Sequence, residues 1–146
     1  MSKINIDQLI LRMESYLECW KQYNSFMAMA RSKKFGVEEE NQFLEIKSVI
    51  TQELELILSS IDCGPISRDE VHGLIAAGPS IRFLSEMNDN ALRTIEAQWH
   101  KLFIGLQSIL GQLKVKQQQT EGKSFMSSLM GRKERFAACH RPRISV

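Results

Sequence analysis

Several features that would assign a function directly are scarce in this chain of 146 residues. Its three cysteines, Cys19, Cys63 and Cys139, lie far apart and form no CxxC pair. This scattered, odd-numbered set argues against a disulfide framework and favours free thiols in a reducing compartment, so we expect a cytoplasmic protein. The apolar run at residues 9–11 is too short for a signal-peptide core, and no run approaches the roughly 18 residues of a membrane span.

Motifs that carry chemistry are also scarce. The glycine spacing of residues 73–80 is that of a phosphate-binding loop, but Pro79 stands where that loop needs its lysine. The three histidines are isolated, and Glu96 with His100 falls short of the four ligands of a zinc site. No nucleophile stands beside a base in a recognisable arrangement. We therefore expect a protein without enzymatic activity or cofactor, and leave open a metal site built from distant residues.

Apolar periodicity is the informative property of the chain. A step that alternates three and four residues is typical of an α-helix packed lengthwise against another helix. One such stripe predicts a helix over residues 7–32, and a second predicts a helix over residues 90–118. The first stripe consists of Ile6, Leu9, Met13, Tyr16, Trp20, Tyr23, Met27 and Ala30. The second consists of Leu92, Ile95, Trp99, Leu102, Leu106, Ile109 and Leu113.

Turn and capping residues delimit the remaining helices. Acidic residues 38–40 suit the start of a helix that stops at Gly64 and Pro65. Two short helices are predicted over residues 67–77 and 80–87, the first opened by a capping box at residues 67–70.

Two glycines have a predicted structural role. Gly36 is expected to take the left-handed position that closes the first helix. Gly105, in the middle of a helix, is expected to permit the close approach of an aromatic side chain from the first helix.

We predict an all-α fold: an up-and-down helical bundle of three long helices plus a short helical pair, with a basic C-terminal tail. The connection after the first helix is about five residues long, so the first two helices should form an antiparallel hairpin. The predicted bundle domain covers residues 1–119 and the basic tail covers residues 120–146.

The charge is divided between these parts. Residues 1–113 hold 11 Lys and Arg against 15 Asp and Glu, a net charge of −4. Residues 114–146 hold 8 against 2, a net charge of +6. An acidic helix (residues 38–62, net −6) and a basic tail therefore belong to one chain.

Aromatic and methionine side chains crowd the first helix. Such residues are enriched at interaction surfaces, and methionine adapts to varied partners. One hypothesis makes part of this stripe a homodimer seam or a groove for a client helix. The alternative, that the stripe simply fills the monomer core, is the more frequent outcome of this pattern. The candidate partner-binding residues are Tyr16, Trp20, Tyr23 and Met27.

The tail interleaves basic and apolar residues. A segment of this kind can lie on an anionic membrane, dock in a groove of a partner protein or follow the backbone of a nucleic acid. It can equally be a solubilising tail that folds back on the acidic helix. The candidate tail-binding residues are Lys123, Phe125, Leu129, Arg132, Lys133, Arg135 and Phe136.

These observations favour recognition over catalysis. We expect a non-catalytic helical adaptor or regulator that binds protein partners through helix surfaces and forms a homodimer; a chaperone-like action is one form that this role can take. The alternative is peripheral membrane or nucleic-acid binding through the basic tail.

Overall fold

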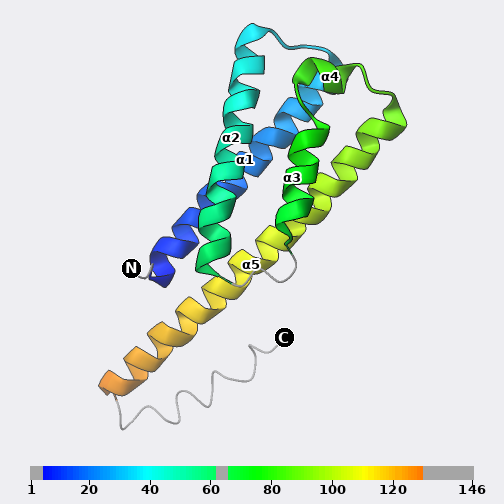
Figure 1. Cartoon of the computed structure of the whole chain (residues 1–146). Helices are drawn as coiled ribbons and strands as arrows, with labels where there is room; N and C mark the ends of the chain where they lie inside the picture. Colours follow the sequence, from blue (N-terminus) through cyan, green and yellow to red (C-terminus); the bar gives the residue numbers. More distant parts are fainter. Residues whose placement is uncertain (1–4, 62–65, 130–146) are drawn as a thin grey trace.

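The computed structural model describes residues 5–61 and 66–129, with side chains up to residue 120. The described chain forms five helices and no strand, which confirms the predicted all-α class (Figure 1). The helices are α1 (Ile6–Ser32), α2 (Val37–Ser60), α3 (Arg68–Ala77), α4 (Ile81–Ser85) and α5 (Asp89–Leu129).

Short polar side chains cap the helix starts. The Ser67 hydroxyl accepts a hydrogen bond from the Glu70 amide at 3.2 Å, so the predicted start of α3 is confirmed. Asn88 accepts one from the Ala91 amide at 2.8 Å and opens α5. Ser80 caps α4 in the same manner. These bonds satisfy amides that the first helical turn leaves without a partner.

The turn between α1 and α2 differs from the prediction for Gly36. The residue in the left-handed conformation is Lys33, with φ 60°. Its N–H donates to the carbonyl of Ala30 and closes α1. Gly36 has φ −134° and instead precedes α2, where its N–H donates to Glu39 Oε1 at 2.7 Å. The left-handed position falls on the residue directly after the helix, and Gly36 stands too far along the chain to supply it.

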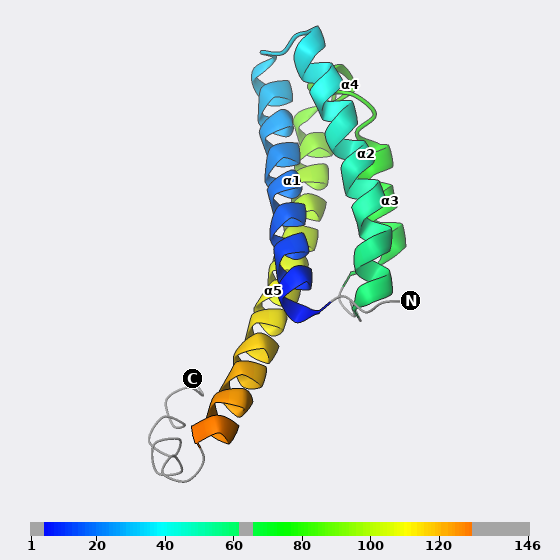
Figure 2. The same ribbon diagram turned by 90° about the vertical axis from the view of Figure 1, so that its left-hand side faces the viewer.

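Helix α1 is the centre of the arrangement. It contacts α2, α4 and α5, and α3 contacts both α2 and α5. Figures 1 and 2 show α2 and α5 running antiparallel to α1 on different sides of it. The predicted hairpin of the first two helices is therefore present.

The apolar stripes form the core, as the periodicity predicts. Every residue of the α1 stripe is buried except Ile6, which is half-buried, and every residue of the α5 stripe is buried. From α2, four residues complete this core: Phe43, Ile50, Leu54 and Ile57. The α4 residues Ile81 and Leu84 cover its upper end.

Buried polar groups tie α1 to its neighbours. The indole N–H of Trp99 on α5 donates to the carbonyl oxygen of Trp20 on α1 at 2.9 Å. The hydroxyl of Tyr16 donates to the carbonyl oxygen of Ile50 on α2 at 3.1 Å. An unpaired buried donor costs free energy. These bonds therefore favour one position of α2, and one of α5, along the axis of α1.

Helix α5 is longer than predicted. The predicted end was residue 118, whereas the helix continues to Leu129. Gly122 costs a helix only about 1 kcal/mol relative to alanine, and the first proline after it is Pro142. The sequence features read as a helix end are therefore too weak to stop it.

The extra length of α5 has no counterpart in α1. Forty-one residues span about 61 Å at 1.5 Å per residue, against about 40 Å for α1. The Gln117 amide donates to Asp7 at 2.6 Å, beside the first turn of α1. Beyond this point α5 projects past the other described helices (Figures 1 and 2).

Gly105 permits a close approach, but from a different neighbour than predicted. A Cβ at this position would stand 2.8 Å from Cδ1 of Ile66, which precedes α3. No aromatic side chain of α1 fills this role. The glycine therefore allows the connection into α3 to pack against α5.

The α3–α4 turn is held to α2 by two charged side chains. Lys47 Nζ donates to the carbonyl oxygens of Gly78 and Pro79 at 2.8 and 3.2 Å. Burial lowers the pKa of Lys47, partly offset by the carboxylate of Glu40. Glu40 accepts hydrogen bonds from the first two backbone N–H groups of α4, both at 2.9 Å. The glycine–proline segment, whose sequence resembles part of a phosphate-binding loop, thus forms the α3–α4 turn and is bound by Lys47 of α2.

We predict that Lys47→Met destabilises the fold by about 1–3 kcal/mol, because two carbonyl oxygens lose a charged donor while the apolar stem is kept. Urea denaturation followed by circular dichroism measures the change. The control is Lys34→Met, at an exposed lysine in the α1–α2 turn. Its effect should stay within about 0.5 kcal/mol. Equal effects of the two substitutions would contradict the role of Lys47.

Candidate functional site

The predicted partner-binding residues of α1 lie inside the protein. Tyr16 is 1% exposed, and Trp20, Tyr23 and Met27 are 0% exposed. The Tyr16 and Trp20 rings meet edge to face with centroids 6.2 Å apart, and Tyr23 lies 5.3 Å from the ring of Phe43. This burial favours the core alternative, because these side chains cannot reach a partner unless the helices separate.

Tyr23 is a polar residue fully buried in this core. Its hydroxyl donates to the carbonyl oxygen of Leu74 on α3 at 3.5 Å, and burial raises the pKa of Tyr23 well above its usual value. The same hydroxyl approaches Gly78, where a Cβ would lie 2.8 Å from it. Tyr23 therefore holds α1 against the α3–α4 turn.

The predicted tail-binding residues are not tested by these contacts. Positions 123, 125 and 129 belong to the last turns of α5, where the structure describes the backbone. Arg132, Lys133, Arg135 and Phe136 lie outside the described residues. Binding by Lys123, Phe125, Leu129 and these four residues stays a prediction.

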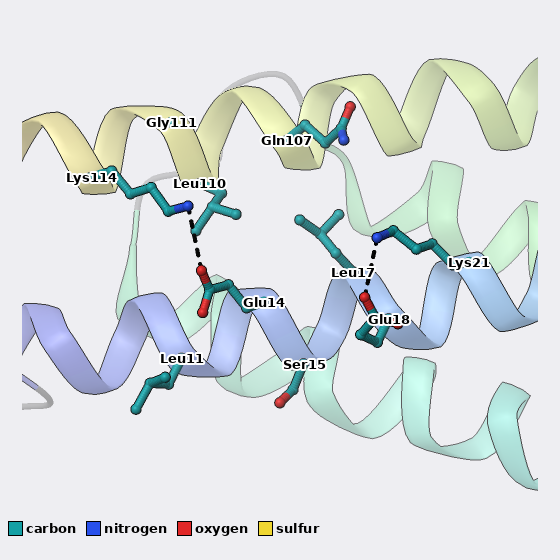
Figure 3. Close-up of a pocket in the computed structure, with 10 residues that line it drawn as sticks. All are labelled: Leu11, Glu14, Ser15, Leu17, Glu18, Lys21, Gln107, Leu110, Gly111 and Lys114. Atoms are coloured by element: carbon teal, nitrogen blue, oxygen red, sulfur yellow. Dashed lines mark hydrogen bonds and ion pairs between the residues drawn. The ribbon is translucent and has the colours of Figure 1, made fainter.

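A groove of about 620 Å³ runs along the seam between α1 and α5 (Figure 3). Leu17 and Leu110 line it with apolar surface. Leu11, which is 64% exposed, lies at one end of the lining, and its side chain points away from α5 (Figure 3). It leaves apolar surface open to contact at the edge that this groove shares with α2.

One ion pair crosses the groove from α1 to α5, and a second lies along α1 (Figure 3). Glu14 on α1 pairs with Lys114 on α5 at 3.4 Å, and Glu18 pairs with Lys21 on α1 at 3.1 Å (Figure 3). All four side chains are between 44% and 63% exposed, so each pair contributes at most about 1 kcal/mol. Such pairs can separate at little cost and offer charged groups of both signs to a ligand.

Gly111 leaves part of the groove empty. A Cβ built on it would meet nothing within 4 Å, in contrast to Gly105, which accommodates Ile66. A glycine inside a helix costs about 1 kcal/mol relative to alanine. Gly111 is exposed and its Cβ position faces open space, as that of Gly73 on α3 does, so no contact within the described chain requires a glycine there.

A second groove, of about 430 Å³, lies between α1 and α2 and shares Leu11 and Ser15 with the first. Cys19 lines it beside Glu53. Burial first, and then the nearby carboxylates, raise the pKa of the Cys19 thiol. A neutral thiol is a weaker nucleophile than a thiolate.

Two further findings concern residues 5–61 and 66–129. This part of the chain contains no group of three His, Cys, Asp or Glu residues that could hold a metal ion. None of its helices combines the length and apolar character needed to cross a membrane. Glu96, considered above with His100, forms an ion pair with Arg31 at 2.7 Å.

Comparison with known proteins gives no assignment. No protein-family model matches the chain, and neither a curated protein nor a solved structure is significantly similar to it.

Sequence reasoning did not find the α1–α5 groove. Its residues fall between the stripes, where apolar side chains usually need no explanation. Two signals pointed there: Leu11 lies off the buried stripe of α1, and Gly111 lies off that of α5.

We predict that Trp20→Ala lowers the free energy of unfolding by about 3–5 kcal/mol, because a large buried side chain leaves a cavity. Chemical denaturation measures this loss. The control, Leu11→Ala, removes an exposed side chain and should change stability by about 0.5 kcal/mol or less. An unchanged stability of the Trp20 variant together with weaker self-association would instead support the predicted contact role.

We also predict a pH-dependent difference for Tyr23→Phe. Above pH 10 the unfolded chain loses the Tyr23 proton while the folded chain keeps it, since burial raises its pKa. The unfolded state then binds fewer protons, so the stability of the original protein falls by up to about 1.4 kcal/mol per pH unit from this group. Tyr23→Phe should show a shallower alkaline decline in urea titrations. Equal slopes above pH 10 would contradict this.

Proposed function

We propose that this protein is a non-catalytic helical adaptor or regulator that binds protein partners through the α1–α5 groove. The observation that carries the proposal is the combination of exposed Leu11, the leucine-lined seam and the vacant space at Gly111. The predicted role in protein binding is kept, but its surface moves from the buried stripe of α1 to the groove beside it.

The groove suits a helical partner better than a small molecule. Pockets for small molecules usually enclose most of the ligand surface. Here the antiparallel helices α1 and α5 border an open strip that is lined by three leucines and Gly111 among polar and charged side chains (Figure 3). An amphipathic helix can place side chains three or four residues apart into such a strip. Its charged flanks can then pair with Glu14, Glu18, Lys21 or Lys114.

The charge distribution supports a second candidate function. Residues 114–146 carry a net charge of +6. A basic segment with interleaved apolar residues is suited to an anionic membrane or a nucleic acid. This alternative, like the division into a bundle (1–119) and a tail (120–146), the chaperone-like action and the cytoplasmic location, remains a proposal.

Site-specific photocross-linking in cells tests the groove. A photoreactive phenylalanine analogue at position 11 should give protein adducts, because this position borders the apolar strip. The matched control is position 37, where Val37 is 78% exposed on α2 and outside the groove. Adducts at position 11 should decrease when Gly111→Leu fills the groove. Equal labelling at positions 11 and 37, or adducts insensitive to Gly111→Leu, would overturn the proposal.

A further inference from the structure

A hollow opens at the lower end of the core in Figure 1, where α1 begins and α2 ends beside α5. Its volume is about 340 Å³. At the opposite end of the core, α4 supplies two buried side chains as a cover. At the lower end the described residues leave this hollow instead. Five apolar residues line it: Ile6, Leu9, Ile61, Ile109 and Leu113.

Helix α1 starts at the edge of the hollow with a side-chain cap. The Asn5 side chain accepts a hydrogen bond from the Gln8 N–H at 2.9 Å, and the Asn5 backbone is extended. Asn5 is therefore the capping residue, and Leu9 is the fourth residue of the helix. At helix starts of this kind, an apolar residue directly before the cap often packs against the fourth helical residue. Ile4 is the residue directly before this cap.

The same arrangement is present at the start of α3. Its cap is Ser67, and the residue directly before the cap is Ile66. Ile66 is 6% exposed, and Val71, the fourth residue of α3, is 0% exposed. Both side chains belong to the core. The apolar residue before a polar cap is therefore a core residue at this helix start.

The start of α5 repeats the pattern. Asn88 caps the helix, and Met87 before it packs against the core. The fourth residue of α5, Leu92, is 4% exposed. Two described helix starts thus place the residue before the cap in contact with the core. The start of α1 has the same order of residue types, and its fourth residue, Leu9, lines the hollow.

The chain connection favours Ile4 over a separate molecule as the occupant. Asn5 directly precedes Ile6, which is one of the lining residues, so Ile4 is tethered beside the hollow. A tethered side chain enters without the loss of translational freedom that a second molecule incurs on binding. Burial of an isoleucine against an apolar lining also removes apolar surface of both from water.

We infer that the Ile4 side chain occupies this hollow and packs against Leu9 of α1 and Leu113 of α5. The segment before Asn5 then closes the lower end of the core and joins the start of α1 to α5, as α4 closes the upper end. This inference is independent of the proposed function, because the α1–α5 groove shares no lining residue with the hollow.

Methyl NMR of the full-length protein tests the contact directly. Nuclear Overhauser cross-peaks should join the δ1 methyl of Ile4 to the methyls of Leu9 and Leu113, and Ile4→Val assigns the δ1 signal by removing it. The control is Val37, which is 78% exposed at the first position of α2 and should show no cross-peak to these leucines. A folded protein without the Ile4 cross-peaks would overturn the inference. Cross-peaks from Leu9 and Leu113 to another segment, or to a second chain in a mixed-label sample, would do the same.

Urea denaturation measures what the contact contributes. Ile4→Ala should lower the equilibrium constant for folding about tenfold, which corresponds to about 1.4 kcal/mol. Ile4→Leu should lose about threefold or less, since it keeps the apolar volume. The matched control is Val37→Ala, which also shortens an aliphatic side chain near a helix start and should change the constant by about twofold or less. Equal losses for Ile4→Ala and Val37→Ala contradict the proposed burial.

A double variant separates the contact from effects on the unfolded chain. If Ile4 packs against Leu113, the combined loss in Ile4→Ala with Leu113→Val should be smaller than the product of the two single losses. The control pair is Ile4→Ala with Leu102→Val, because Leu102 is a buried residue of α5 outside the hollow. Its two losses should multiply. Multiplying losses in both pairs would refute the contact, and photocross-linking from position 11 would still test the groove separately.

Discussion

The packing of α1 between α2 and α5 is the interaction on which the rest of the structure depends. A single stripe of side chains on α1 faces both neighbours, and bulky aromatics make it wide enough to do so. The indole N–H of Trp99 then donates a hydrogen bond to a backbone carbonyl of α1, and the hydroxyl of Tyr16 donates one to a backbone carbonyl of α2. The short helices α3 and α4 are added to it through Tyr23, Lys47 and Glu40.

Much of this core could be predicted from the sequence. The alternation of three and four residues identifies the buried faces of α1 and α5 because helical geometry leaves few other ways to bury such a stripe. The start of α3 was equally accessible at Ser67, where a short polar side chain satisfies a nearby amide. These features depend on residues close together in the chain.

Features that depend on distant residues were not accessible in the same way. The approach of Ile66 to Gly105 follows from the path of the chain into α3, which periodicity does not specify. The end of α5 was misplaced because Gly122 and the nearby serines weaken a helix without forbidding it. The stripe on α1 was read as a possible contact surface because a wide apolar face looks the same in sequence whether a partner chain or the same chain covers it. Only the positions of α2 and α4 in the fold show whether the same chain covers this face.

The groove between α1 and α5 is a by-product of the same architecture. Two long helices that share a core on one side leave a shallow furrow on the other, and its depth is set by the side chains along it. Gly111 is one of the residues that line this furrow, and it adds no side chain to it.

The location of the two tryptophans has a practical consequence. Trp20 and Trp99 are the only indoles of the chain, they are 0% and 8% exposed, and one donates its N–H to the backbone of the other. Intrinsic fluorescence therefore reports on the contact between α1 and α5. Emission at a short wavelength, resistant to quenching by iodide, would mark an intact helix pair, and surface events in the groove would leave that signal largely unaltered.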